Sequence, residues 1–189
     1  RFESYKDGKS LVVDVGCGRG EFLELLKNNG VLVEGLDLNI KMVEETKEKG
    51  INAFEKDALS YLSTKKSKSI GAITGFHIVE HIPFEELMAI FEECYRTLVK
   101  GGFVLFETPN PENILVGSNR FYNDPSHLKP IPPTILDFML QTIGFKTEII
   151  RLHPEKTQTE IAKKSNNELL TEIAHNMFGP QDYAVVGYK

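Results

Sequence analysis

The stretch that decides the fold of this chain is Leu11–Phe22, with the sequence LVVDVGCGRGEF. A short apolar run ends in an acid, three glycines follow at alternate positions, and an amphipathic segment begins at Glu21. This order is typical of a buried strand, a tight turn and a helix. Glycine lets a ligand approach the backbone without meeting a Cβ, and the helix start offers free N–H groups to an anion. The stretch therefore predicts a cofactor site.

Composition limits the class of protein. The chain has 189 residues, 41% of them hydrophobic, which is enough for one domain over residues 1–189. The net charge of −5 argues against a nucleic-acid binder, which needs a basic face. No apolar run approaches the roughly 20 residues of a transmembrane helix. We therefore expect neither a nucleic-acid partner nor a transmembrane segment.

The two cysteines and the first residues bear on the setting of the protein. Two cysteines, Cys17 and Cys94, do not make a disulfide scaffold and favour a reducing, cytoplasmic location. Cys17 is expected to fill space in the glycine turn, and Cys94 to lie in the core. The chain opens on Arg1 with neither Met nor a signal peptide, as a piece of a longer chain would. The oligomeric state stays open.

Strand and helix signals alternate from Leu11 to about Lys146. The strands are predicted over Leu11–Val15, Val31–Asp37, Asn52–Lys56, Ile70–Phe76, Phe103–Glu107, Phe145–Arg151 and Tyr183–Tyr188. The helices are predicted over Glu21–Asn29, Ile40–Lys49, a short segment near Tyr61, Phe84 to about Val99, and Pro133–Ile143. Such alternation predicts an α/β fold with a mostly parallel sheet and helices on both faces.

Two segments interrupt this order. Residues 109–133 are rich in Pro, Asn, Gly and Ser and are predicted to be irregular, and a loop of roughly 25 residues is expected to be functional. Residues 152–180 form a polar insertion, mobile over Lys156–Glu168 and helical through Met177. The core of the domain then consists of residues 11–151 and 182–189.

The glycine turn fits three interpretations. A nicotinamide or flavin dinucleotide site has the pattern G-x-G-x-x-G/A, which needs Gly or Ala where this chain has Glu21. A site for S-adenosylmethionine (SAM) has D/E-x-G-x-G-x-G, which Asp14-x-Gly16-x-Gly18-x-Gly20 matches. A tight turn without any ligand is the third. The spacing favours SAM, whose amino end needs an anion nearby.

Two further acids end predicted strands. Asp37 lies about twenty residues beyond the turn, where an acid accepts hydrogen bonds from a ribose diol. Asp57-Ala58 follows the third strand, in a position to contact the adenine amino group. Each aspartate could also be only a helix N-cap. Together with the glycines, they favour a nucleoside site.

The segment His77–His81 follows the fourth strand and matches H-x-x-E-H, an inverted zinc-protease signature. Zinc needs a continuous helix there and a third ligand. The segment instead leaves a strand directly and meets Pro83, so we expect no metal. The alternatives are a loop that carries chemistry, and a structural turn in which one histidine caps the next helix and Glu80 is solvated.

Together these pieces, with Leu98–Gly102 before the fifth strand, resemble the class I SAM-dependent methyltransferases over most of residues 11–107. The resemblance implies a Rossmann-like, seven-stranded sheet whose last strand is antiparallel. It implies SAM as cofactor and S-adenosylhomocysteine as product. The cofactor residues it implies are Asp14, Gly16, Cys17, Gly18, Gly20, Asp37, Leu38, Asp57, Ala58 and His77.

A narrower resemblance lies in the second half. Thr108–Pro111, Phe121–His127, Lys129-Pro130 and Phe178–Tyr183 are similar to the methyltransferase part of O-antigen chain-terminating methyltransferases. Those enzymes methylate a terminal sugar of a surface polysaccharide or a phosphate on it. The resemblance implies a glycan acceptor and a possible partner protein in polysaccharide assembly. This chain has no kinase domain, which some of those enzymes carry.

The candidates for catalysis are histidines, because a sugar hydroxyl must lose its proton and imidazole is a suitable base. The candidates are His81 and His77 after the fourth strand, and His127 with Asp124 and Tyr122 on the long loop. An aspartate beside a histidine could orient its ring. Arg120, Lys129 and His127 are cations for an anionic acceptor. Residues 121–127 could alternatively be only a packed surface lid.

Other functions stay open at this point. One is a methyltransferase acting on a small metabolite or a quinone precursor. Another is a non-catalytic SAM-fold module that binds a partner. An NAD-dependent oxidoreductase is the last, and Glu21 argues against it.

Overall fold

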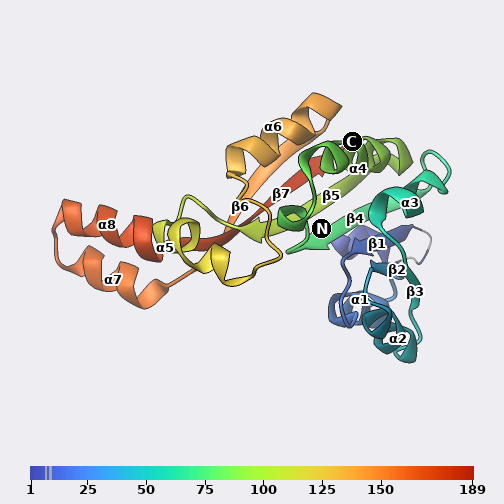
Figure 1. Ribbon diagram of the computed structural model, residues 1–189, viewed down its shortest axis with the longest axis horizontal. Helices are drawn as coiled ribbons and strands as arrows, with labels where there is room; N and C mark the ends of the chain where they lie inside the picture. The colour runs from blue at the N-terminus through green and yellow to red at the C-terminus, as the bar shows by residue number, and fades with distance from the viewer. Residues whose placement is uncertain (7, 9) are drawn as a thin grey trace.

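The computed structural model describes residues 1–6, 8 and 10–189 (Figure 1). The strands are β1 (Leu11–Val15), β2 (Leu32–Asp37), β3 (Asn52–Glu55), β4 (Ile70–Phe76), β5 (Leu98–Pro109), β6 (Lys146–Pro154) and β7 (Pro180–Tyr188). The α-helices are α1 (Glu21–Asn28), α2 (Ile40–Glu48), α3 (Ala58–Ser63), α4 (Phe84–Thr97), α5 (Ile114–Ser118), α6 (Pro133–Ile143), α7 (Lys156–Lys164) and α8 (Glu168–Phe178). Short 3₁₀ helices are η1 (Phe2–Tyr5), η2 (Val79–His81) and η3 (Arg120–Asn123).

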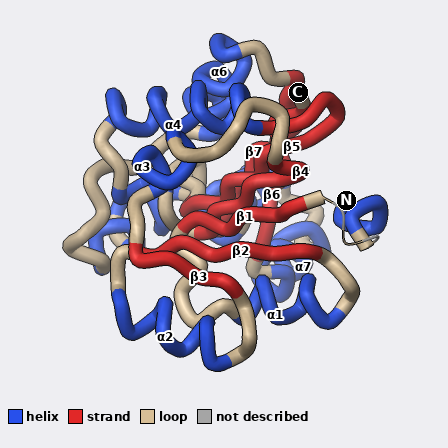
Figure 2. Tube along the Cα trace, turned by 90° about the vertical axis from the view of Figure 1, so that its right-hand side faces the viewer, coloured by secondary structure: helices blue, strands red, loops and turns tan. Residues whose placement is uncertain are grey.

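The strands form one seven-stranded sheet in the order β3-β2-β1-β4-β5-β7-β6. Neighbours from β3 to β5 pair in parallel, and β7 pairs antiparallel with both β5 and β6. Helices cover both faces, with α3, α4 and α6 on one side and α1 and α2 on the other (Figure 2). The predicted Rossmann-like sheet with an antiparallel last strand is confirmed.

The turn after β1 has the backbone that its glycines predict. Gly16, Gly18 and Gly20 all have positive φ, at 69°, 52° and 74°, which glycine adopts without a steric penalty. Cys17 N donates to Leu36 O at 2.8 Å, which joins the turn to β2. A Cβ on Gly35 would lie 2.7 Å from Cys17 Sγ, so glycine there makes room for the thiol. Burial raises the pKa of the Cys17 thiol to about 12, so Cys17 fills space, as predicted.

The last two strands are longer than their sequence pattern predicts. β6 and β7 pair continuously from Lys146↔Tyr188 to Pro154↔Pro180, beyond the predicted ends at Arg151 and Tyr183. β5 begins at Leu98, which pairs with Ile70, and not at Phe103. Backbone pairing does not need apolar side chains, so these extensions carry no hydrophobic signal.

The two irregular segments contain more helix than predicted. Residues 109–133 hold α5 and η3, and the Asn113 side chain caps α5 by accepting from Leu115 N and Val116 N. Lys156–Lys164 is helix α7, which packs against α8, so this part of the insertion is more regular than predicted, and its mobility stays a prediction. Among the described residues, no helix is both long and apolar enough to cross a membrane.

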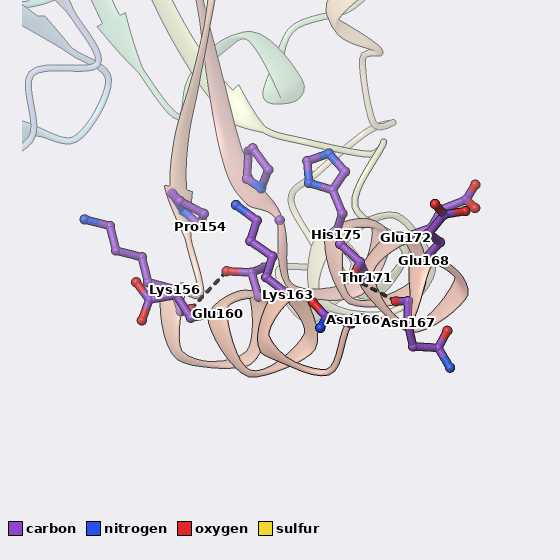
Figure 3. A pocket seen from close by; sticks show the side chains of 13 residues that line it. Pro154, Lys156, Glu160, Lys163, Asn166, Asn167, Glu168, Thr171, Glu172 and His175 are labelled. Atoms are coloured by element: carbon purple, nitrogen blue, oxygen red, sulfur yellow. Dashed lines mark hydrogen bonds between the residues drawn. The ribbon is translucent and has the colours of Figure 1, made fainter.

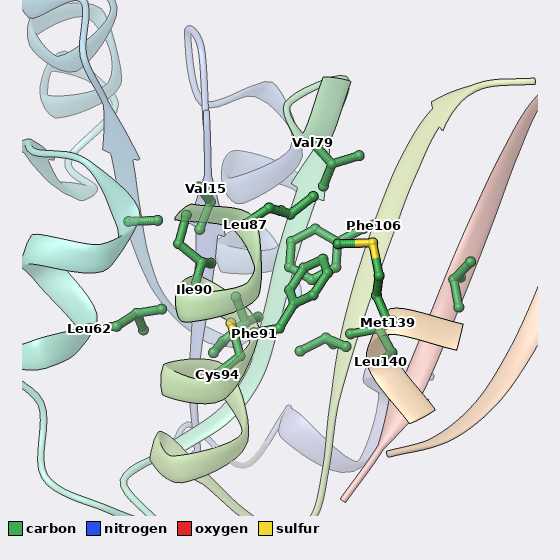
Figure 4. Packing of buried hydrophobic residues seen from close by; sticks show 14 of the residues in the cluster. Val15, Leu62, Val79, Leu87, Ile90, Phe91, Cys94, Phe106, Met139 and Leu140 are labelled. Carbon is green, nitrogen blue, oxygen red and sulfur yellow. The ribbon is translucent and has the colours of Figure 1, made fainter. Parts of the chain in front are cut away.

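The larger core lies between the sheet and α3, α4 and α6 (Figure 4). Phe91 on α4 is fully buried, and its ring centroid lies 5.1 Å from that of Phe106 on β5. Cys94 lies one turn away and is also buried, as predicted. This contact fastens α4, and with it the segment before α4, to the centre of the sheet.

Phe91→Ala is expected to lower the free energy of unfolding by about 3–5 kcal/mol, because it removes buried area and leaves a cavity. Phe138→Ala is the matched control, since Phe138 on α6 is 62% exposed and its loss should cost less than about 1 kcal/mol. Urea denaturation of both variants measures the difference. Equal losses would contradict the assignment of Phe91 to the core.

Candidate active site

Two adjoining cavities, of about 770 and 270 Å³, lie where β1, β2 and β4 end. Volumes of this order suit a small ligand. Residues lining both cavities are Gly16, Asp37, Leu38, Ile78 and His81. The larger cavity adds His77 and Ser126, and the smaller adds Asp57 and Ala58. The structure thus brings together six residues of the predicted cofactor site, His77 among them, and the second histidine of the 77–81 segment, His81.

Asp37 fastens the glycine turn to the end of β2. Its Oδ2 accepts from Gly18 N at 3.0 Å, and its Oδ1 accepts from Asn39 N at 2.8 Å. Thr46 Oγ1 donates to Gly18 O at 3.0 Å. A Cβ built on Gly18 would meet nothing within 4 Å, so the turn opens onto free space there. An acid, an open glycine and the apolar side chain of Leu38 fit the diol and ring of a nucleoside.

Asp57 and Ala58 line the smaller cavity. Asp57 Oδ1 accepts from Ser60 N at 2.7 Å and caps α3, and the bond from the Ser60 backbone lowers the pKa of Asp57. Asp57 is therefore a helix N-cap and a cavity residue at once. The two interpretations of this aspartate do not exclude each other.

Asp14 lies beneath the turn. It is 3% exposed, and its Oδ1 accepts from Thr74 Oγ1 at 2.6 Å. Burial raises the pKa of Asp14 to about 7. Asp14, Cys17, Gly18 and Gly20 are not among the described residues that line the two cavities. Asp14, Cys17 and Gly20 pack against the turn, whereas Gly18 opens onto free space, and a direct contact of any of these four with the cofactor stays a prediction.

A carboxylate and three imidazoles meet beside the cavities. Glu80 is 1% exposed, and its Oε2 accepts from Thr108 Oγ1 at 2.8 Å. Its Oε1 lies 3.5 Å from His77 Nδ1 and 3.8 Å from His127 Nε2. The rings of His81 and His127 lie 4.7 Å apart between centroids. The structure thus brings His77, His81 and His127 together. The alternative in which Glu80 is solvated is wrong, because this glutamate is buried.

The long loop folds back onto η2. Leu128 N donates to Glu80 O at 2.9 Å, and His81 Nδ1 lies 3.2 Å from Ser126 O. His127 Nδ1 lies 2.6 Å from Phe121 O, so the proton of this ring is assigned to Nδ1. These bonds place His127 next to the 77–81 segment, although 46 residues separate it from His81 in the chain.

Asp124 and Tyr122 are less closely involved. Asp124 Oδ1 accepts from Ser126 N at 2.8 Å, and the bonds from Ser126 lower the pKa of Asp124. Its Oδ2 lies 4.0 Å from His127 Nε2, so Asp124 makes a turn first and faces the histidine second. Tyr122 is 62% exposed and packs its ring on Phe121.

The predicted cations have other partners. Arg120 pairs with Glu155 at 2.9 Å and with Gln181, which ties η3 to the β6–β7 ribbon. Lys129 Nζ lies 5.6 Å from the ring centroid of Phe84, at an apolar cavity of about 260 Å³. Lys129 therefore lines a cavity, whereas Arg120 is engaged with Glu155 and Gln181.

The H-x-x-E-H match does not have zinc-protease geometry. β4 ends at Phe76, and only Val79–His81 is helical, in a 3₁₀ turn. Two sets of three side chains each hold potential metal-ligand atoms within 4.8 Å of one another. One set is Glu80, His81 and His127, and the other is His77, Glu107 and Asp182.

A separate hollow of about 870 Å³ lies between α7 and α8 (Figure 3). Its lining is polar and charged and includes Lys163, Glu160, Glu172 and His175. It shares no residue with the cavities at the glycine turn. This hollow is therefore not part of the candidate site.

Residues 1–149 match the family described as "Methyltransferase domain". The chain belongs to this family. A crystal structure of a SAM-dependent methyltransferase from Archaeoglobus fulgidus superposes with a TM-score of 0.89 at 33% identity, over 100% of this chain and 90% of that one. One from Mesorhizobium loti superposes with a TM-score of 0.71 at 18% identity, over 97% and 93%, and supports the fold alone. The family is that of class I SAM-dependent methyltransferases, and SAM is its cofactor.

Curated relatives of this methyltransferase domain carry the name ubiquinone biosynthesis O-methyltransferase. The one from Nitrosomonas europaea is 31% identical over 104 residues, which are 52% of this chain and 43% of the relative. The one from Psychrobacter arcticus is 29% identical over 160 residues, which are 75% and 62%. The chain spans less than two thirds of the length of these relatives.

Gly18→Val is expected to weaken SAM binding by roughly tenfold or more, because a branched side chain would fill the open space at the turn and strain a left-handed residue. Gly101→Val is the matched control, since Gly101 also has positive φ and open space but lies on β5 away from the cavities. Titration calorimetry with SAM compares the two. Unchanged affinity in Gly18→Val would refute the placement of the cofactor.

The contribution of Asp14 to the free energy of unfolding is expected to fall as pH rises from about 4 to about 7. The folded protein keeps the proton on Asp14 up to a pKa of about 7, whereas the unfolded chain releases it near 3.8. The slope from this group is at most about 1.4 kcal/mol per pH unit. Asp14→Asn stays neutral and should lose less stability over this range. Urea denaturation at several pH values tests this, and parallel pH dependences would contradict it.

Proposed function

We propose that this methyltransferase domain transfers a methyl group from SAM to an oxygen atom of a small organic acceptor. The observation that carries the proposal is the position of His77 and His81, which line the larger cavity together with Gly16 and Asp37. A hydroxyl acceptor must lose its proton, and an imidazole beside the cofactor cavity can take it. A phosphate acceptor would need only cations or hydrogen-bond donors.

The chemistry divides between the cofactor and the chain. When bound, SAM supplies a methyl group on a sulfonium centre that is already activated for displacement. The chain's share is to align the acceptor, exclude water and hold a proton. His81 Nδ1 lies 3.2 Å from both the carbonyl and the hydroxyl oxygen of Ser126, and the tautomer with its proton on Nδ1, which fits the carbonyl, leaves Nε2 as the basic atom.

An apolar cavity supports a small acceptor with a hydrophobic part. The cavity of about 260 Å³ lies against Glu80 and has Lys129 in its wall. Its apolar lining comes from Val79, Ile82, Phe84, Leu87, Pro130, Ile131, Pro132, Ile135 and Met139. The names of the curated relatives also favour a small metabolite, such as a quinone precursor, over a polysaccharide.

A terminal sugar or sugar phosphate of a surface polysaccharide is the second candidate. It rests on the run Phe121–His127, whose Ser126 lines the larger cavity. The long loop also contributes Asn110 and Asn113 to a polar cavity of about 430 Å³, which has Arg151 in its wall. The names of the curated relatives mention ubiquinone biosynthesis and no polysaccharide, so we place this acceptor second.

His77→Ala, His81→Ala and His127→Ala are each expected to change SAM affinity little. At least one of them should lower the single-turnover rate by roughly 100-fold or more, because a general base contributes on that order. Tritiated SAM with a panel of phenols, catechols and terminal sugars measures transfer. His175→Ala on α8 is the control. Full rates in all three variants, on an acceptor that wild type methylates, would show that no histidine is the base.

A further inference from the structure

Glu80 has a buried oxygen that the fold does not satisfy. Among the described residues, Glu80 Oε1 is the one buried side-chain oxygen or nitrogen without a hydrogen-bond partner. Its other oxygen is held by Thr108, so the carboxylate cannot turn toward solvent. A buried carboxylate oxygen without a donor costs free energy, which folded proteins tolerate mainly where the group has a function.

Two imidazoles face this oxygen, and they are not equivalent. His127 Nδ1 lies against the Phe121 carbonyl, which can only accept, so the tautomer that fits this contact has no proton on Nε2 to donate to the carboxylate. His77 presents Nδ1 at 3.5 Å, the shorter of the two distances. Hydrogen bonds at catalytic sites are often long before the substrate binds. His77 is therefore the neutral donor that Glu80 can accept from.

We propose that Glu80 is the positioning residue of His77: Oε1 accepts a hydrogen bond from Nδ1–H, and Nε2 is left as the base of a ring that lines the larger cavity. This rests on the proposed function, in which the acceptor is a hydroxyl that must lose its proton. The proton of the acceptor hydroxyl moves to Nε2, and the acceptor oxygen keeps the electron pair for its new bond to the methyl carbon, while the bond from that carbon to sulfur breaks and leaves its electron pair on sulfur. The imidazolium then has Glu80 at one nitrogen and Glu107 at the other, 3.8 Å from Nε2.

The backbone holds His77 in place for this role. His77 has a φ of 52°, a strained conformation for a non-glycine residue, and its N–H donates to Glu107 O at 2.9 Å. The charged groups that face the ring are Glu80 from η2, Glu107 from β5 and Asp182 from β7. The nearby Glu80 carboxylate raises the pKa of His77, and Asp182 and Glu107 add to the shift. The backbone conformation fixes the position of this imidazole, and the three carboxylates favour its protonated form.

The test compares wild type with Glu80→Gln by nitrogen-15 NMR of the histidine rings, without acceptor. Wild-type His77 is expected to carry its neutral proton on Nδ1. In Glu80→Gln, the titration midpoint of His77 should fall by about one pH unit or more, because the carboxylate that stabilises the imidazolium is gone. Glu80→Asp should restore part of the shift. Glu93→Gln on α4 is the control. It makes the same change at a glutamate that pairs with Arg96, and it should leave the titration midpoint of His77 unaltered.

Kinetics give the second readout, on any hydroxyl acceptor that wild type methylates. Glu80→Gln should lower kcat roughly 10- to 100-fold with little change in KM. The acid limb of its kcat profile should move to lower pH, since His77 loses its proton more readily.

Several results would overturn the role of Glu80. They are a wild-type His77 protonated on Nε2, an unchanged His77 titration in a folded Glu80→Gln protein, and a divalent metal that binds wild type tightly and is lost in Glu80→Gln. If Glu80→Gln does not fold, the wild-type tautomer and Glu80→Asp still decide. Failure of the proposed function is distinguishable, because a protein that methylates no hydroxyl would still give the NMR result.

Discussion

The left-handed turn after β1 is the constraint on which the site depends. Three residues with positive φ reverse the chain within five positions, and a side chain at any of them would be strained. The turn is held from both sides, since Asp37 accepts from Gly18 N and Thr46 donates to Gly18 O. Because β1 is central in the sheet, this turn fixes where β2 and β4 deliver their own terminal residues.

Strand direction then explains why distant residues meet. β1, β2 and β4 are parallel, so their carboxyl ends place Gly16, Asp37 and His77 at one edge of the sheet. β7 runs the other way, and its first residues reach the same edge, where Asp182 pairs with Pro109. The antiparallel strand therefore adds an acid to a site that parallel strands alone would build.

Much of this was predictable from sequence, and the rest was not for physical reasons. The bounds of β1 and β4 and the helix after the glycine turn follow from apolar runs and a cofactor motif, as local signals do. The extensions of β6 and β7 come from pairing with each other, and α7 is stabilised by α8, which no local pattern records. Glu80 was overlooked because its burial depends on Thr108, 28 residues away, and on a loop beyond residue 120.

Glu80 also links the two halves of the candidate site. Its backbone carbonyl accepts from Leu128 N, which holds the long loop, while its side chain faces His77 and His127. Further along, Tyr183 donates from its buried hydroxyl to Ile131 O at 2.7 Å, so the loop is fixed at a second point on β7. A segment with no regular pattern is thereby held by hydrogen bonds to η2 and to β7. Substitution of the Glu80 side chain leaves the backbone bond to Leu128 in place, so it changes the charge beside the histidines without removing that anchor of the loop.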